Sequence, residues 1–338
     1  MSTPALKTLF HPFESGALDL PEPHARVLFL GAKLGFRTPE GFTRELTAVQ
    51  GFRPDFLALQ REGLKVLPHG EGSDYTAALV LCGRHRGENE LNVAEALERG
   101  SDGALILIAG SNDDGVASLA KRMGKLIALE GRSPKHHGLA FWFRAPADRL
   151  EIAAALRQAN ATTLVEGRFE TSPGMFSYDR VDPGSRLLAE ALPQNLSGKV
   201  ADFCAGWGYL SAELMLRSPG ISSIDLYEAE FSSLEAARRN VKSETVPARF
   251  FWHDLLAEPV EHHYDAIVMN PPFHQGRAAE PEIGQKLIAL AAKALTRRGV
   301  LFLVANKGLP YEKALTASFE EYRQIAGDNA FKVFAARR

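Results

Sequence analysis

Four residues that could act on a nucleobase, Asn270, Pro271, Pro272 and Phe273, follow the apolar run YDAIVM at 264–269. The prolines lack N–H groups and keep their predecessors extended, so the Asn270 amide oxygen and the Pro271 carbonyl would be two fixed hydrogen-bond acceptors. Two such acceptors can hold both hydrogens of an exocyclic amine and turn its lone pair toward an electrophile. The Phe273 ring could stack on the same base. The segment therefore predicts chemistry on a base amine.

A glycine turn and three acids form a second group of candidate residues. The stretch DFCAGWG at 202–208 joins a predicted strand to a predicted helix, where small residues and free N–H groups allow a ligand to approach. Glu228 ends the next predicted strand, where a carboxylate can bind a ribose diol, and Asp254 ends the third. A dinucleotide dehydrogenase is disfavoured, because G-x-G-x-x-G is incomplete and such an enzyme does not need the proline motif. We expect a ligand with ribose and adenine but no pyrophosphate.

The C-terminal half alternates strands and helices, the pattern of a mostly parallel sheet covered on both faces. A hairpin around Gly327 is expected to close the edge, and residues 161–192 read as an extended approach to this domain. The other predicted elements are strands at 199–206, 222–230, 248–256, 264–270 and 300–306 and helices at 209–218, 232–243 and 282–299.

The N-terminal half contains a fainter copy of the same plan, which indicates an internal duplication. Residues 26–36 align with 199–209, so that Val27 meets Val200, and 75–87 align with 264–276. The copy has lost its polar residues, since Phe29 replaces Asp202. In place of the proline motif it has Cys82, Gly83, Arg84 and His85. We expect a binding or structural domain there.

These motifs together resemble the class I S-adenosylmethionine-dependent methyltransferases that modify exocyclic amines. More closely, PGMFSYDRVDPGSRLLAEAL, NPPFHQG, VANKGLPY and FKVF resemble the bacterial ribosomal RNA guanine-N2 methyltransferases, including the small-subunit enzyme built from two tandem methyltransferase-like domains. The resemblance is specific over 172–335. It implies an α/β fold with two tandem Rossmann-like domains, a degenerate one at 1–160 and a catalytic one at 161–338. Each has a mostly parallel sheet with a C-terminal antiparallel hairpin.

The resemblance also implies the roles of residues. S-adenosyl-L-methionine would be the methyl donor, and Asn270, Pro271, Pro272 and Phe273 would hold the target guanine. The sequence departs from the family at Cys204 and Ala205, where Gly-Cys is common. The residues expected to bind the donor are Asp202, Cys204, Ala205, Gly206, Gly208, Glu228, Asp254 and Leu255.

The implied partner is ribosomal RNA or the small ribosomal subunit, although the net charge of the 338 residues is only −2. RNA must therefore be held by a local basic patch. The candidates are Arg84, His85, Arg86, Lys121, Arg122, Lys125, Arg132, Lys135, His136, His137 and Arg144.

No metal is expected, because a sulfonium donor needs none, so His253, His262, His263 and His274 are interpreted as structural or RNA-facing. Two cysteines, Cys82 and Cys204, read as buried reduced thiols. Without a membrane-length apolar run or a signal-like start, we expect a cytoplasmic monomer.

Two alternatives to guanine-N2 methylation stay open. The same pair of acceptors could serve N6 methylation of adenine in RNA or DNA. A non-catalytic RNA-binding or assembly protein with two inactive domains would follow if the altered turn excludes the donor.

Overall fold

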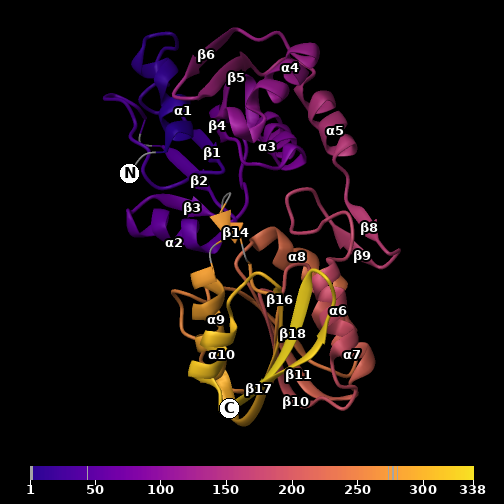
Figure 1. The fold of residues 1–338 in the computed structure, drawn as a ribbon. Helices are drawn as coiled ribbons and strands as arrows, with labels where there is room; N and C mark the ends of the chain where they lie inside the picture. Colours follow the sequence, from indigo (N-terminus) through magenta and orange to yellow (C-terminus); the bar gives the residue numbers. More distant parts are fainter. Residues whose placement is uncertain (1–2, 44, 273, 276–277, 280) are drawn as a thin grey trace. The chain divides into compact units, whose positions relative to one another are not determined.

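The computed structural model describes residues 3–43, 45–272, 274–275, 278–279 and 281–338 (Figure 1). The chain forms two compact units. Unit 1 comprises Met1–Thr162 and Ser172–Gly174, and unit 2 comprises Thr163–Thr171 and Met175–Arg338. None of the described helices is long and apolar enough to cross a membrane.

Unit 1 is a seven-stranded sheet in the order β3-β2-β1-β4-β5-β7-β6, with helices on both faces (Figure 1). β7 runs antiparallel to both of its neighbours, β5 and β6, and the other neighbouring strands are parallel. Its strands are β1 (Val27–Leu30), β2 (Leu46–Val49), β3 (Lys65–Leu67), β4 (Tyr75–Leu81), β5 (Gly100–Ser111), β6 (Gly131–Lys135) and β7 (Gly138–Arg144). One face packs against α1 (Pro4–Glu14) and α2 (Arg53–Arg61), and the other against α3 (Arg86–Arg99), α4 (Val116–Leu126) and α5 (Arg149–Ala159); the 3-10 turn η1 (Asn112–Asp114) precedes α4.

Unit 2 has a second seven-stranded sheet in the order β12-β11-β10-β13-β16-β18-β17. Its strands are β10 (Ser197–Phe203), β11 (Gly220–Glu228), β12 (Ala248–Trp252), β13 (Tyr264–Met269), β16 (Leu295–Asn306), β17 (Glu321–Gly327) and β18 (Phe331–Arg337). One face packs against α6 (Pro183–Ala191), α7 (Tyr209–Arg217) and α8 (Phe231–Asn240), and the other against α9 (Pro281–Ala294) and α10 (Glu312–Ser318). Two short hairpins complete it, β8 (Thr163–Val165) with β9 (Phe169–Thr171) and β14 (His274–Gln275) with β15 (Ala278–Ala279).

The two sheets have the same strand order, so the predicted tandem Rossmann-like domains and the closing antiparallel hairpin are confirmed. The central pairs also share a register, with Val27 opposite Ala77 in unit 1 and Val200 opposite Ala266 in unit 2. This register agrees with the predicted alignment of 75–87 with 264–276 and corrects only the residue named in the place of Asn270. It is Leu81, one residue before Cys82, that takes the place of Asn270.

Unit 1 has apolar or neutral side chains where unit 2 has acids. Phe29, in the place of Asp202, is fully buried and packs edge-on against Phe36 at 5.3 Å. Gln50 takes the place of Glu228, and its amide is bonded within its own unit. Its Nε2 donates to the Ala32 carbonyl at 2.7 Å, and its Oε1 accepts from the Phe52 N–H at 2.8 Å. These contacts support the interpretation of unit 1 as a domain without donor chemistry.

Two predicted elements of unit 2 were wrong. Residues 161–192 are not one extended segment, because they contain α6. Asp182 caps this helix by accepting from the Ser185 N–H at 2.8 Å, and Pro183 occupies a first-turn position where no N–H is needed. The helix predicted at 282–299 ends at Ala294, since the chain from Leu295 onward finds backbone partners in β13.

A buried polar network joins three strands of unit 2. Asp225 on β11 is fully buried and accepts two hydrogen bonds from the Arg249 guanidinium, at 2.7 and 2.6 Å. The Tyr264 hydroxyl donates to Asp225 at 2.7 Å, and the Tyr227 hydroxyl lies 2.7 Å from that of Tyr264. The carboxylate is therefore compensated by one cation and one hydroxyl.

We expect Arg249→Met to lower the free energy of unfolding by about 3 kcal/mol, because it leaves a buried carboxylate without its cation. Arg238→Met is the matched control, since Arg238 pairs with the exposed Glu235 and should cost less than about 1 kcal/mol. Urea denaturation of both variants checks this. Equal losses would contradict a special role for the Asp225 network.

Candidate active site

The carboxyl ends of β10 and β13 are where the strand order of unit 2 reverses, and ligands of such sheets bind at this point. The chain leaves β10 at Phe203 and enters α7 through residues 204–208. On the neighbouring strand it leaves β13 at Met269 and continues into Asn270. The topology thus brings the predicted glycine turn and the predicted amine-binding motif to one crevice.

The two glycines of the turn have different tasks. Both have left-handed backbones, with φ of +56° at Gly206 and +89° at Gly208. A Cβ at Gly208 would lie 2.6 Å from a methyl group of Val241, so this glycine is needed for packing. A Cβ at Gly206 would meet nothing within 4 Å, so this glycine faces open space. Cys204 also has a positive φ, +61°, although it is not glycine.

A pocket opens above this turn. Four predicted residues line it, namely Cys204, Ala205, Gly206 and Asn270. Seven residues that the sequence prediction did not assign to the site also line it: Phe176, Ser177, Asp182, Ser185, Trp207, Tyr209 and Leu210. Most of these come from 176–185 and were missed because that segment was read as a connection. The helix-cap pattern Asp-Pro-Gly-Ser at 182–185 was the available signal.

One edge of the pocket carries an exposed aromatic ring. Phe176 is 53% exposed, and its carbonyl accepts a hydrogen bond from the Trp207 indole N–H at 2.9 Å. Trp207 packs in turn against Phe169, with ring centroids 5.2 Å apart. The backbone at Phe176 is thus held at the pocket by the buried indole of the glycine turn.

Glu228, at the end of β11, is hydrogen-bonded to the glycine turn. Its Oε2 accepts from the Gly206 N–H at 2.7 Å, and its Oε1 accepts from the Glu230 N–H at 2.7 Å. Burial raises the pKa of this carboxyl above its usual value, while the backbone donors act in the opposite direction. Each carboxylate oxygen has a second lone pair that a ligand hydroxyl could use.

Asp202 lies near the end of β10, two residues before Cys204, which lines the pocket. It is fully buried, and its Oδ2 accepts from both the backbone N–H and the hydroxyl of Ser211 on α7, at 3.1 and 2.7 Å. Its Oδ1 has no hydrogen-bond partner within the part of the chain that the structure describes. Burial raises the pKa of Asp202 to about 7, against the effect of the Ser211 bonds. Its predicted contact with the donor stays a prediction.

Asp254 and Leu255 follow β12, and neither lines the pocket. The Asp254 Oδ1 accepts from the Leu256 N–H at 2.9 Å, so this carboxylate caps a turn. The preceding N–H, of His253, donates to the Glu228 carbonyl at 2.9 Å, which keeps the ends of β11 and β12 together. The predicted role of these two residues in adenine binding stays a prediction.

The proline motif is described in part. The Asn270 side-chain nitrogen donates to Asp182 Oδ2 at 3.0 Å and to Ser185 Oγ at 2.8 Å. Pro271 is buried and Pro272 is exposed. Phe273 lies outside the described residues, so its stacking role stays a prediction.

The histidines and cysteines near the turn have packing contacts. His253 packs edge-on against Tyr227 at 5.2 Å, and its Nε2 lies 3.1 Å from the Glu258 carbonyl. Both cysteines are free thiols, and burial raises the pKa of Cys82 to about 12 and that of Cys204 well above its usual value. Among the described residues, no three His, Cys, Asp or Glu side chains are grouped as metal ligands would be.

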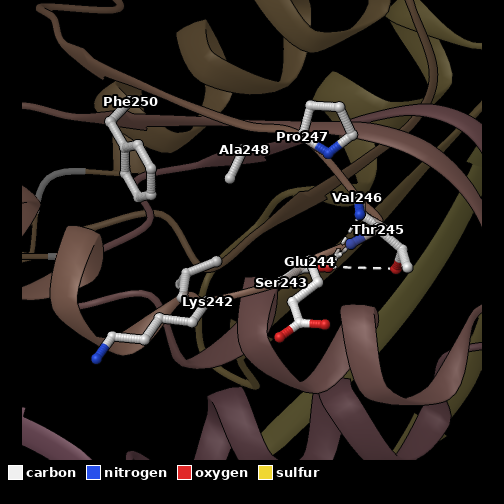
Figure 2. Close-up of a pocket in the computed structure, with 9 residues that line it drawn as sticks. Lys242, Ser243, Glu244, Thr245, Val246, Pro247, Ala248 and Phe250 are labelled. Atoms are coloured by element: carbon white, nitrogen blue, oxygen red, sulfur yellow. Dashed lines mark hydrogen bonds between the residues drawn. The ribbon is translucent and has the colours of Figure 1, made fainter.

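A wider hollow lies elsewhere in unit 2, beside the loop at 242–247 that precedes β12 (Figure 2). It is lined by that loop together with Val241, Ala248 and Phe250, and the Ser243 and Thr245 hydroxyls face each other there at 3.5 Å. This is the amino end of β12, whereas the glycine turn lies at the carboxyl edge of the sheet. None of the predicted site residues lines it, so we assign the chemistry to the smaller pocket.

Comparison with known proteins decides the family. Residues 166–335, half of the chain, match the family model of the methyltransferase small domain. The chain belongs to the methyltransferase small domain family. This confirms the resemblance inferred from the sequence motifs, and it places every pocket residue inside the matched region.

Relatives of this methyltransferase small domain protein cover both halves of the chain. The ribosomal RNA small subunit methyltransferase C of Salmonella newport is 31% identical, over 72% of this chain and 69% of the relative. The protein of the same name from Haemophilus influenzae is 28% identical over 75% of this chain and 77% of the relative. The solved T. thermophilus 16S rRNA N2 methyltransferase has a TM-score of 0.79 at 22% identity, covering 99% of this chain and 92% of that one. It therefore shares the fold of this protein.

The raised pKa of Asp202 predicts a pH-dependent stability. The folded-state pKa of about 7 exceeds the ordinary value of 3.8, so stability should fall as the pH rises between these values. Asp202→Asn cannot ionise and keeps an acceptor for Ser211. The free energy of unfolding of the wild type should therefore fall relative to that of Asp202→Asn by ~2 kcal/mol as the pH rises from 5 to 8. Urea denaturation across this range checks the trend, with the exposed Asp179→Asn as control. Parallel curves for Asp202→Asn and wild type would refute it.

Proposed function

We propose that unit 2 transfers a methyl group from S-adenosylmethionine to the N2 amine of a guanine in the RNA of the small ribosomal subunit. The position of Asn270 carries this proposal, because its amide lies in the wall of the pocket that the glycine turn forms. The names of the relatives and of the similar solved structure support the choice of substrate. The curated relatives are ribosomal RNA small subunit methyltransferases, and the T. thermophilus protein was solved with AdoMet and guanosine.

The residues around the turn fit the methyl donor. Gly206 leaves room for a ligand, and Glu228 keeps lone pairs available for ribose hydroxyls. The buried Oδ1 of Asp202 has no partner among the residues that the structure describes. These three residues would hold the donor, with Cys204 and Ala205 in the pocket wall. When bound, S-adenosylmethionine supplies an electrophilic methyl group on a sulfonium.

The residues of the proline motif act on the target amine. A guanine amine is a weak nucleophile, because its lone pair is delocalised into the ring. The Asn270 Oδ1 and the Pro271 carbonyl would accept its two hydrogens and favour a pyramidal nitrogen with a directed lone pair. The proton that the amine loses after transfer can pass to water. The exposed ring of Phe176 could cover the base or the donor.

The assay that tests this function uses labelled S-adenosylmethionine with undermodified small subunits and with naked 16S RNA, followed by mass spectrometry of the nucleosides. N2-methylguanosine supports the proposal. N6-methyladenosine would keep the mechanism and replace the substrate. If there is no product and calorimetry detects no donor binding, the non-catalytic alternative holds. We also propose that the protein is a cytoplasmic monomer and that it needs no metal, because the sulfonium donor is itself the electrophile.

We expect Asn270→Ala to lower kcat at least about a hundredfold, the typical cost of losing one oriented polar contact to the reacting group, and to spare donor binding. Glu228→Gln should instead weaken donor binding by roughly ten- to a hundredfold, because a charged acceptor is lost. Calorimetry with the donor and single-turnover methylation separate the two effects. Loss of donor binding in Asn270→Ala would overturn this division of roles.

We further propose that unit 1 binds the RNA backbone through α4 and the β6–β7 hairpin. Lys121 and Lys125 are exposed on α4, and Arg132 and Lys135 are exposed on β6. A Cβ at Gly124 would lie 3.6 Å from the Arg132 guanidinium, so the cations of the two elements adjoin. Within the described part of the chain, no carboxylate pairs with these four. We name them the basic patch.

Three of the predicted RNA-binding arginines have carboxylate partners. The Arg86 Nε lies 3.6 Å from Glu90 Oε1. Arg122 forms two contacts with the buried Glu90, at 2.7 and 2.8 Å, so its role is to compensate that carboxylate. Arg144 lies 3.7 Å from Glu130. The patch is therefore smaller than predicted, and it can be changed without removing a partner from a buried charge.

The double variant Lys121→Glu/Lys125→Glu should weaken RNA binding at least about tenfold and reduce the salt slope of log Kd by ~1 to 2, because fewer counterions are released. The matched control is Arg61→Glu/Lys65→Glu, at the opposite edge of the sheet of unit 1. Filter binding at several salt concentrations measures both. Equal effects of the two double variants would rule out a local patch.

A further inference from the structure

We propose that Asp182 and Ser185 are positioning residues that fix the amide of Asn270 with its oxygen toward the target amine. This inference rests on the proposed function and adds two residues to the reaction. Its basis is the pair of hydrogen bonds from the Asn270 Nδ2, to Asp182 Oδ2 at 3.0 Å and to Ser185 Oγ at 2.8 Å. All three side chains line the same pocket.

The carboxylate of Asp182 decides which way the amide faces. An ionised carboxylate can only accept hydrogen bonds, whereas a hydroxyl can donate or accept. If the Asn270 amide turned over, its oxygen would face the Asp182 oxygen, and two acceptors would repel each other. Ser185 alone would tolerate either orientation. The preference for one orientation therefore comes from Asp182, and Ser185 satisfies the second N–H.

The fixed orientation matters because an amide has two chemically opposite ends. With Nδ2 bonded to α6, Oδ1 is the end that is left to accept a hydrogen from a base amine. A reversed amide would present N–H groups to the amine hydrogens and oppose binding in the reactive pose. Holding the acceptor in place before the substrate arrives is the usual way in which oriented dipoles lower a barrier.

Helix α6 is built to bring these groups to Asn270. Asp182 Oδ2 caps the helix through the Ser185 N–H at 2.8 Å, so one oxygen receives both this bond and that from Asn270. A Cβ at Gly184 would lie 2.9 Å from the Phe331 ring on β18 and 3.1 Å from Asp182 Oδ2. Glycine at 184 thus allows the first turn of α6 to pack closely on the sheet.

The first test is Asp182→Asn, which separates positioning from capping. Asparagine caps helices as well as aspartate does, so the stability of α6 should be kept. The neutral amide oxygen of an asparagine at 182 accepts from Asn270 more weakly than a carboxylate oxygen, and if that side chain turns over its NH2 group can donate to Asn270 instead, so the orientation is imposed less strongly. We expect kcat to fall at least tenfold, with the KM for RNA, the donor affinity and the Tm nearly unchanged. Asp179→Asn is the matched control, since Asp179 is exposed in the same segment and contacts Arg180.

A charge exchange gives a second, more specific test. In Asn270→Asp, two carboxylates face each other and transfer should be lost. In Asp182→Asn/Asn270→Asp, the new amide at 182 can donate to the new carboxylate at 270, whose other oxygen can still accept from the base amine. We expect the double variant to recover at least tenfold over Asn270→Asp. No recovery would show that Asp182 does not act through residue 270 and would overturn the inference.

A third readout needs no turnover, so failure of the inference can be told from failure of the proposed function. The side-chain amide signal of Asn270 is identified in nitrogen-15 spectra by its loss in Asn270→Ala. In Asp182→Asn, both of its protons should shift and exchange faster with deuterium. An unchanged signal, or wild-type kcat in Asp182→Asn, would overturn the inference. A wild type that transfers no methyl would overturn the proposed function, and the amide signal would still decide the role of Asp182.

Discussion

The hydrogen bonds that Glu228 accepts connect the glycine turn after β10 to the end of β11 in unit 2. One oxygen binds the Gly206 N–H of the turn after β10, and the other binds the Glu230 N–H after β11. The Gly206 N–H can face the carboxylate because Gly206 has a left-handed backbone, which glycine adopts without strain. Glu228 thus holds Gly206, which lines the pocket together with Asn270.

Unit 1 has the same scaffold, but the neutral side chain of Gln50 takes the place of the Glu228 carboxylate. Gln50 accepts from the Phe52 N–H just after β2, much as Glu228 accepts from the Glu230 N–H after β11. Toward its own turn, however, Gln50 donates an N–H to the Ala32 carbonyl. Phe29 fills the place of a buried carboxylate with an aromatic ring. The strand order and the central register are retained, because they depend on apolar faces and backbone bonds rather than on the polar residues. Fold and chemistry are therefore separable in this chain.

Three carboxylates of unit 2, the buried Asp202 and Asp225 and the half-buried Glu228, are each compensated differently. Asp225 has a guanidinium and a hydroxyl, and Glu228 has backbone N–H groups. Asp202 has one serine and an oxygen with no partner in the described ranges of the chain. Burial of Asp202 and Glu228 raises the pKa of both. The least compensated of these carboxylates, Asp202, lies two residues before Cys204, which lines the pocket, and a ligand group could complete it.

Much of the fold and part of the site followed from the sequence alone. Strand periodicity, the glycine turn, the acid at 228 and the Asn-Pro-Pro motif are local signals, because each depends on side-chain type and on neighbours along the chain. They predicted the tandem domains, the closing hairpin and the residues around the turn.

The tertiary structure decided what depends on distant partners. Asp182 and Ser185 lie more than eighty residues before Asn270, so only the packing of α6 against the sheet could reveal their contact. The end of α9 was set by pairing with β13, and the assignment of Arg122 by a buried acid on another helix. These outcomes follow from long-range contacts, which override local preference and leave no periodic trace in the sequence.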